Sequence, residues 1–327
     1  MSQKKETSCK LDREIESSQE AKTESQLARI ERYSKAKRQA ETHQRYIEES
    51  FDKYQGRQKQ DLVSLYDKLT SCGHYLLFHH YYTIGEYRLA EAHFCKKHTV
   101  CPLCAIRRGA KMLRTYLERF EYLRSQNLML RASLVTLTVK NGPDLKERFE
   151  HLTGGVKNAN QRIRDYKRGR GKTSIFRHFL GYVGSYEVKR GKNSGLWHPH
   201  AHMIVLHQVD IDPKQLAKEW QAITGDSFII DVTTIDNTDP VKAFCEVFKY
   251  ALKFSSMGSA DLLEAYFLLF GRQLVFSAGL FRGLKVPKDL TDTLLDDLPY
   301  IELLYRYTSA GYSLSEYNGQ KITPRGL

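Results

Sequence analysis

The stretch 197–206, Trp-His-Pro-His-Ala-His-Met-Ile-Val-Leu, constrains the fold most, because three histidines recur at every second position before an apolar run. On a β-strand alternate side chains share a face, so His198, His200 and His202 would point the same way, about 7 Å apart. On a helix, residues two apart diverge and could not meet at one ion. The apolar run and its β-branched residues favour a strand. We therefore predict a strand that presents His200 and His202 to one metal ion, although a single histidine in such a run is more often packed or exposed.

The preceding segments predict further strands of the same sheet. Residues 132–139 form a β-type run that ends in a turn at 140–143, and residues 179–188 form another. A Gly-rich basic turn at 189–195 then joins the second run to the histidine strand as a hairpin. Glu187 would lie near this turn, within reach of the histidines. A carboxylate beside two imidazoles suits a divalent cation with open positions for substrate oxygens, and His198 is the alternative third ligand.

A second candidate metal site lies upstream, around the Cys101-x-x-Cys104 motif. Such a turn points two thiolates at one zinc ion, and Cys95 together with Cys72 or His98 can complete a tetrahedral site. A lone motif of this kind is also typical of redox sites, but the additional Cys and His residues favour zinc. Six cysteines in 327 residues are too few for a disulfide scaffold.

The net charge of +13 favours a polyanionic partner, nucleic acid before an acidic membrane. Between positions 157 and 177 eight Lys/Arg residues face one acid, which is typical of a loop that follows phosphates. A solvated basic face is the alternative for the predicted helix after the cysteines. The candidate phosphate contacts are Arg107, Arg108, Arg168, Arg170, Lys172 and Lys192. With no apolar run of 18 residues and no signal-peptide pattern, we expect a soluble cytoplasmic protein without a membrane partner.

A third motif follows on a predicted helix that has Pro240 in its first turn. Glu246 and Tyr250 are four residues apart, and Lys253 follows Tyr250 by three, so all three would share a face. Such a face can hold a tyrosine nucleophile, a carboxylate base and a cation for phosphate. A Glu–Tyr pair alone is more often structural, so this prediction depends on the histidine strand nearby.

Composition divides the chain into four predicted segments. Residues 1–60 are a charged arm, helical or disordered, and residues 61–124 are a zinc-binding segment with a basic helix. Residues 125–287 are the catalytic core, and residues 288–327 are a C-terminal tail.

In this order, the strand at 134–138, the His-x-His strand and the Glu246-x-x-x-Tyr250 helix resemble the HUH endonucleases. More narrowly, residues 70–285 resemble the replication initiators of small rolling-circle plasmids. The counterparts are the Trp-His-Pro-His-x-His stretch, the upstream Cys-Gly … Cys … Cys-Pro-x-Cys … Arg-Arg stretch and the run 271–279. The position of His98, in the wide gap between Cys95 and Cys101, departs from the family pattern.

The resemblance implies an α+β fold, with the histidines on a central strand of an antiparallel sheet and helices on one side. It implies that Tyr250 attacks a backbone phosphate of the plasmid origin, joins the 5′ end and leaves a 3′-OH primer. Lys253 would favour the phenolate, and Glu246 would activate water for a second cleavage.

The implied cofactors are Mg or Mn at the histidines and structural zinc at the cysteines, and imidazole ligands favour Mn. The implied partners are origin DNA, single-stranded DNA, a host helicase and a possible second copy of the chain. Two alternative functions use the same residues. One is an HUH relaxase or transposase, and the other is a non-enzymatic zinc protein that regulates by binding DNA.

Overall fold

The structure is a computed structural model that describes residues 25–170, 174–191, 193–236, 238–249 and 257–322. By their internal contacts these residues form two compact units. The first comprises the described parts of Met112–Met257 and Glu264–Val286, and the second comprises 25–111, Gly258–Leu263 and 287–322. The four segments of the sequence analysis stay a prediction. The second unit draws residues from all four of them, although from the predicted catalytic core it takes only 258–263 and 287.

The first unit is built on a five-stranded antiparallel sheet with the order β6-β3-β5-β4-β7. Its strands are β3 (Arg131–Thr138), β4 (Gly181–Arg190), β5 (Trp197–His207), β6 (Ile230–Thr234) and β7 (Val275–Gly279). The histidine strand β5 is the middle strand, as predicted, and β4 and β5 form the predicted hairpin. The fold is therefore α+β, with the histidines on the central strand of the sheet, which is paired on both sides.

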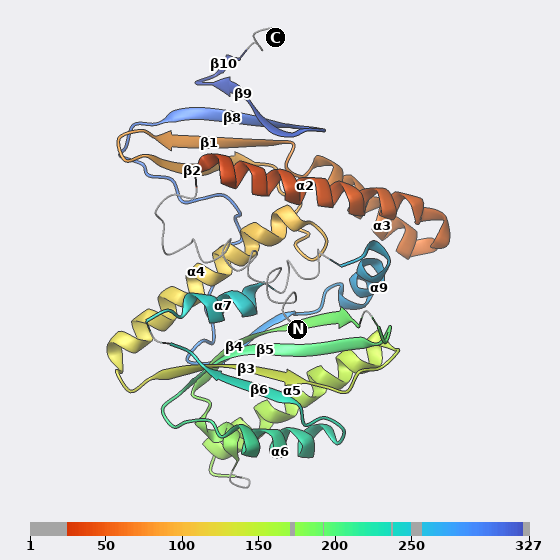
Figure 1. The fold of residues 1–327 in the computed structure, drawn as a ribbon, viewed down its shortest axis with the longest axis vertical. Coiled ribbons are helices and arrows are strands. Elements are labelled where there is room, and N and C mark those ends of the chain that lie inside the picture. The colour runs from red at the N-terminus through yellow and green to blue at the C-terminus, as the bar shows by residue number, and fades with distance from the viewer. Residues whose placement is uncertain (1–24, 171–173, 192, 237, 250–256, 323–327) are drawn as a thin grey trace. The chain divides into compact units, whose positions relative to one another are not determined.

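Helices cover both faces of this sheet (Figure 1). They are α4 (Pro102–Gln126, of which the first unit includes the part from Met112), α5 (Leu145–Lys167), α6 (Pro213–Thr224) and α7 (Val241–Phe248), with a 3-10 turn η2 (Ile175–His178). The first unit also includes the part of α9 (Ser259–Leu269) from Glu264. Phe149 of α5 packs on Tyr186, with ring centroids 5.5 Å apart. On the opposite face, the neighbouring Ser185 donates a 2.6 Å hydrogen bond to the Val247 carbonyl of α7.

The prediction of helices on one side is therefore wrong. Strand β4 is buried continuously from Gly181 to Val188, and β5 is buried at most positions on both faces. A strand that is apolar on both faces needs a layer on each. α5 and α6 supply one layer, and α7 supplies the other together with α4, through the pairs Tyr116–Phe248 and Phe120–Phe244.

The second unit contains a five-stranded antiparallel sheet with the order β10-β9-β8-β1-β2. Its elements are α2 (Gln26–Glu49), η1 (Phe51–Lys53), α3 (Gly56–Ser71), β1 (Tyr75–Tyr81), β2 (Glu86–Ala92), β8 (Ile301–Thr308), β9 (Gly311–Tyr317) and β10 (Gln320–Lys321). The predicted tail thus supplies three of five strands, and α2 from the predicted arm packs against β9. Within the described ranges, every helix is too short or too polar to span a lipid bilayer.

A buried ion network joins separate segments of the second unit. The carboxylate of Asp292 accepts hydrogen bonds from Arg29 at 2.6 Å, Arg107 at 2.5 Å and the Leu89 amide at 2.7 Å. Burial alone would raise the pKa of Asp292, but the guanidinium of Arg107, followed by that of Arg29, holds this pKa well below its usual range. The charge on Asp292 therefore helps to fasten α2, α4 and the segment after residue 287 to one another.

Candidate active site

The pairing register of β4 and β5 determines which side chains meet on the sheet. Glu187 lies opposite His200, and Ser185 lies opposite His202. Since directly paired residues share a face and alternate residues share a face, all four side chains point to the side covered by α7. The predicted proximity of Glu187 to the histidines is thus a consequence of strand register.

The imidazoles of His200 and His202 both approach one oxygen of the Glu187 carboxylate. Oε2 of Glu187 lies 3.4 Å from Nε2 of His200 and 3.4 Å from Nε2 of His202. The donor atoms of the three residues all lie within 4.8 Å of one another. The Glu187 side chain is only 1% exposed, and a buried carboxylate requires a positive partner. The arrangement therefore suits a cation placed between the two nitrogens and the oxygen.

Hydrogen bonds behind the imidazoles orient both rings toward Glu187. Nδ1 of His200 lies 3.4 Å from the His198 carbonyl, which can only accept, so this nitrogen carries the proton. Nδ1 of His202 lies 3.0 Å from the Thr136 hydroxyl on β3. Nε2 of each ring is left to face the carboxylate, which is the usual arrangement around metal-binding histidines. The donor set of two imidazoles and one carboxylate fits Mn²⁺ better than Mg²⁺.

His198, the alternative third ligand, lies beside this cluster and is not one of its three members. Its Nδ1 donates to the side-chain oxygen of Asn141 at 2.5 Å, and its ring centroid is 5.2 Å from that of His200. Burial, followed by the charges of His200 and Lys189, lowers the pKa of His198. The geometry therefore favours Glu187 over His198 beside His200 and His202.

Two lysines that pair with predicted site residues were not singled out from the sequence. Nζ of Lys189 lies 3.1 Å from Oε1 of Glu187, two residues earlier on β4. Nζ of Lys249, just after α7, lies 3.0 Å from Oε1 of Glu246, and the Lys249 side chain is only 6% exposed. The i, i+2 spacing of Glu187 and Lys189 on a strand and the i, i+3 spacing of Glu246 and Lys249 on a helix could have indicated these two pairs.

Helix α7, which carries Glu246 of the third motif, covers the histidine face of the sheet. The bond from Ser185 to the Val247 carbonyl fixes the end of α7 over β4, two residues along the strand from Glu187. Glu246 lies on this helix with its side chain 30% exposed. Tyr250 and Lys253, the predicted nucleophile and its cationic neighbour, lie outside the described residues.

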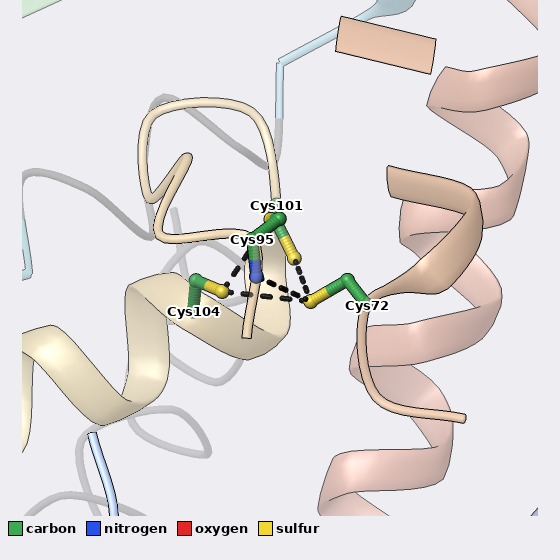
Figure 2. Close-up of side chains that lie close together, drawn as sticks. All are labelled: Cys72, Cys95, Cys101 and Cys104. Carbon is green, nitrogen blue, oxygen red and sulfur yellow. Dashed lines mark hydrogen bonds between the residues drawn. The ribbon is translucent and has the colours of Figure 1, made fainter. Parts of the chain in front are cut away.

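The second predicted metal site is a cluster of four cysteine sulfurs in the second unit. Cys72, Cys95, Cys101 and Cys104 point toward one another (Figure 2). Sulfur–sulfur distances are 3.7 Å for Cys72–Cys101 and 3.6 Å for both Cys72–Cys104 and Cys95–Cys104. A zinc tetrahedron with Zn–S bonds of about 2.3 Å has sulfur–sulfur edges of about 3.8 Å. The four thiols therefore have the spacing of a Cys₄ zinc site, and His98 lies outside it.

Local backbone features bring these cysteines together. Cys72 ends α3, where its carbonyl accepts a 2.6 Å hydrogen bond from the buried Lys37. Gly73 follows with φ +67°, and a Cβ there would lie 2.5 Å from Leu103, so the turn requires glycine. Cys101 precedes α4, and Cys104 is in its first turn. Hydrogen bonds from Cys101, then from Cys104 and Cys95, lower the pKa of the Cys72 thiol, so negative charge in the cluster resides first on the Cys72 sulfur.

The predicted phosphate contacts differ in accessibility. Arg107 is buried and occupied by Asp292, the Leu290 carbonyl and Tyr33, which argues against its predicted contact with phosphate. Arg108 is partly exposed and donates to the Pro287 carbonyl at 2.8 Å. Arg168 and Arg170, at the end of α5, are exposed. Lys172 and Lys192 lie outside the described residues.

Comparison with known proteins identifies a family whose model matches this chain. The model of a family described as "Replication protein" matches residues 86–298. A protein named "Protein rep" from Bacillus sp is 27% identical over 235 residues, which is 70% of this chain and 72% of that protein. A second, from Bacillus amyloliquefaciens, is 26% identical over 71% of this chain and 66% of its own length. A third, from Streptococcus pneumoniae, is 24% identical over 72% and 76%. No solved structure matches the chain.

Proposed function

Because the chain belongs to the replication protein family, as its resemblance to plasmid replication initiators predicted, we propose that it starts rolling-circle replication by nicking one strand of a plasmid origin. The single observation that carries this proposal is the buried convergence of Glu187, His200 and His202 on the middle strand of the sheet. A protein that only binds DNA has no need for a buried cation site beside a helix that leads to a tyrosine.

In this proposal the Tyr250 oxygen attacks the phosphorus of the scissile phosphodiester. The bond to the 3′ oxygen breaks, so that the 5′ phosphate is joined to the tyrosine and the 3′-OH is free to prime synthesis. Glu187, His200 and His202 would hold a divalent cation, which would supply Lewis-acid polarisation of the non-bridging phosphate oxygens. Lys253 then favours the phenolate of Tyr250, whose ordinary pKa of about 10 otherwise disfavours it.

Glu246 completes the proposal as the base for a second cleavage, in which water replaces tyrosine as nucleophile. Its carboxylate is partly exposed, so that water can reach it, and Lys249 holds one of its oxygens at 3.0 Å. The buried ammonium orients the carboxylate and restricts its rotamers. Hydrolysis at the second step ends the cycle without a second protein–DNA bond.

The cysteine cluster has a structural role in this proposal. Four buried or half-buried sulfurs at zinc spacing join the end of α3, the segment after β2 and the start of α4. Zinc bound there stabilises the second unit, because its ligands come from three separate segments of the chain. Arg168 and Arg170, which are exposed, are proposed contacts to the phosphates of single-stranded or origin DNA.

The proposal is tested by incubating the full chain with supercoiled DNA that carries its candidate origin, in the presence of Mn²⁺. We expect relaxation of the DNA and a single nick that maps to one position on one strand. Plasmid without the origin is the matched control. Binding of both substrates with no nick in either would show that the chain is a DNA-binding regulator.

A further inference from the structure

We propose that Lys189 is a positioning residue of the candidate metal centre. Its ammonium group holds Oε1 of Glu187, so that the carboxylate offers only Oε2 to a divalent cation. The inference rests on the proposed function in one respect, since it takes Glu187, His200 and His202 as the cation site.

The two oxygens of Glu187 are already divided between two kinds of partner. Oε2 lies 3.4 Å from both imidazole Nε2 atoms, whereas Oε1 lies 3.1 Å from Nζ of Lys189. Oε1 is itself inaccessible to bulk solvent. Because the Lys189 side chain is 55% exposed, its ammonium reaches this oxygen from the solvent side.

The end of β4 is held firmly enough to keep Lys189 in place. The next residue, Arg190, lies over the ring of Trp197 at 4.5 Å and forms a 2.9 Å ion pair with Glu264. Trp197 is fully buried and donates to the same carboxylate at 3.0 Å. Lys189 itself pairs with His198 across the hairpin, on the face that carries Glu187.

The ion pair between Lys189 and Oε1 affects how the Glu187 carboxylate can bind a cation. A carboxylate can bind a cation through one oxygen or through both, and two-oxygen binding uses one more coordination position. An ammonium on Oε1 opposes the two-oxygen mode and leaves that position for water or a phosphate oxygen. The same positive charge repels the cation and so reduces its affinity. Lys189 therefore lowers the affinity of the site for a cation and keeps one coordination position open.

The test compares Mn²⁺ binding by the full chain and by Lys189→Met, with free Mn²⁺ measured by electron paramagnetic resonance. Loss of a half-exposed charge predicts binding about threefold to fivefold tighter. Water-proton relaxation should also show fewer exchangeable waters on the bound ion. Lys189→Arg should stay close to the unchanged protein in both measurements. Lys218→Met removes an exposed charge from α6, on the other face of the sheet, and should have no effect.

Equal or weaker Mn²⁺ binding by Lys189→Met, with unchanged relaxation, would overturn the inference. The measurement does not depend on nicking, so it can be repeated in a Tyr250→Phe background with the same expected result. A protein that shows the Lys189 effect but leaves origin DNA intact would support this inference and contradict the proposed function. A cation that binds Glu187→Gln as tightly as the unchanged protein would contradict both.

Discussion

Glu187 on β4 lies directly opposite His200 on β5, and this register brings its Oε2 to 3.4 Å from Nε2 of His200. A slip of one residue would turn Glu187 to the face covered by α5 and leave the two imidazoles without a carboxylate. The candidate metal centre therefore depends on the same strand pairing that builds the sheet. Substitutions of its side chains leave that backbone pairing in place, so the role of each residue can be tested without changing the fold.

If Glu187 is the third ligand, substitutions of Glu187 and His198 should affect Mn²⁺ affinity to different extents. Glu187→Gln should weaken Mn²⁺ binding by about tenfold or more, because it removes a charged ligand. His198→Ala should leave the affinity nearly unchanged, since the His198 side chain bonds to Asn141 and the backbone carbonyl that orients His200 is retained. Isothermal titration with Mn²⁺ measures both. The reverse order of effects would make His198 the ligand.

Glu246→Ala should leave the first nick almost unchanged and impair termination. Since Tyr250 performs the first cleavage in our proposal, only the water-dependent step is lost. The defect should appear as replication products longer than one plasmid unit, and Glu246→Asp should be intermediate. Unit-length products at normal yield from Glu246→Ala would make this carboxylate structural.

Lys249→Met should reproduce the termination defect of Glu246→Ala, because it removes the ammonium at 3.0 Å that orients the carboxylate. A role of Lys249 in packing alone would lower stability without lengthening the products. Product length and thermal unfolding, measured on the same protein, separate the two. Lys242→Met, an exposed lysine earlier on α7, is the control and should give unit-length products.

The cysteine cluster predicts one tightly bound zinc ion per chain. Cys104→Ser should lose this zinc and unfold at lower temperature, because four sulfurs from three segments are no longer joined. Cys245→Ser is the matched control, since Cys245 is also buried but is not one of the four clustered cysteines. Elemental analysis that finds no zinc in the unchanged protein would remove the Cys₄ site from this account.

Arg107→Met should cost stability, whereas Arg108→Met should chiefly affect DNA binding. Loss of Arg107 leaves Asp292 buried with one guanidinium fewer, at a cost of about 2–4 kcal/mol. Because the folded-state pKa of Asp292 is lowered, its contribution is present above its ordinary pKa and is lost as pH falls below it. Urea unfolding at pH 7 and pH 3 should therefore show a smaller difference between Arg107→Met and the unchanged protein at pH 3. An equal difference at both pH values would contradict this role.

Much of the first unit could be predicted, because its signals are local. Strand periodicity located β3, β4 and β5, and Pro240 located the start of α7. Apolar residues on both faces of β4 were visible, yet the second helical layer was missed, since sequence alone does not say what covers a buried face.

The second unit was harder to predict because its contacts are distant in sequence. β1 pairs with β8, more than 200 residues later, and Asp292 meets Arg29 across a similar separation. A basic residue on a helix is also ambiguous, so Arg107 was grouped with the DNA contacts although it is buried. The cysteine spacing, in contrast, was sufficient to indicate the cluster that the structure brings together.

The most direct test of the central claim is whether Tyr250 becomes covalently joined to DNA. The full chain is incubated with Mn²⁺ and a single-stranded origin oligonucleotide labelled on the 3′ side of the nick, and the products are denatured and mapped by mass spectrometry. We expect a denaturation-resistant adduct in which Tyr250 carries the 5′ phosphate. Tyr250→Phe should bind the same DNA nearly as well and form no adduct. An adduct of normal yield in Tyr250→Phe, or one mapped to another residue, would contradict the account.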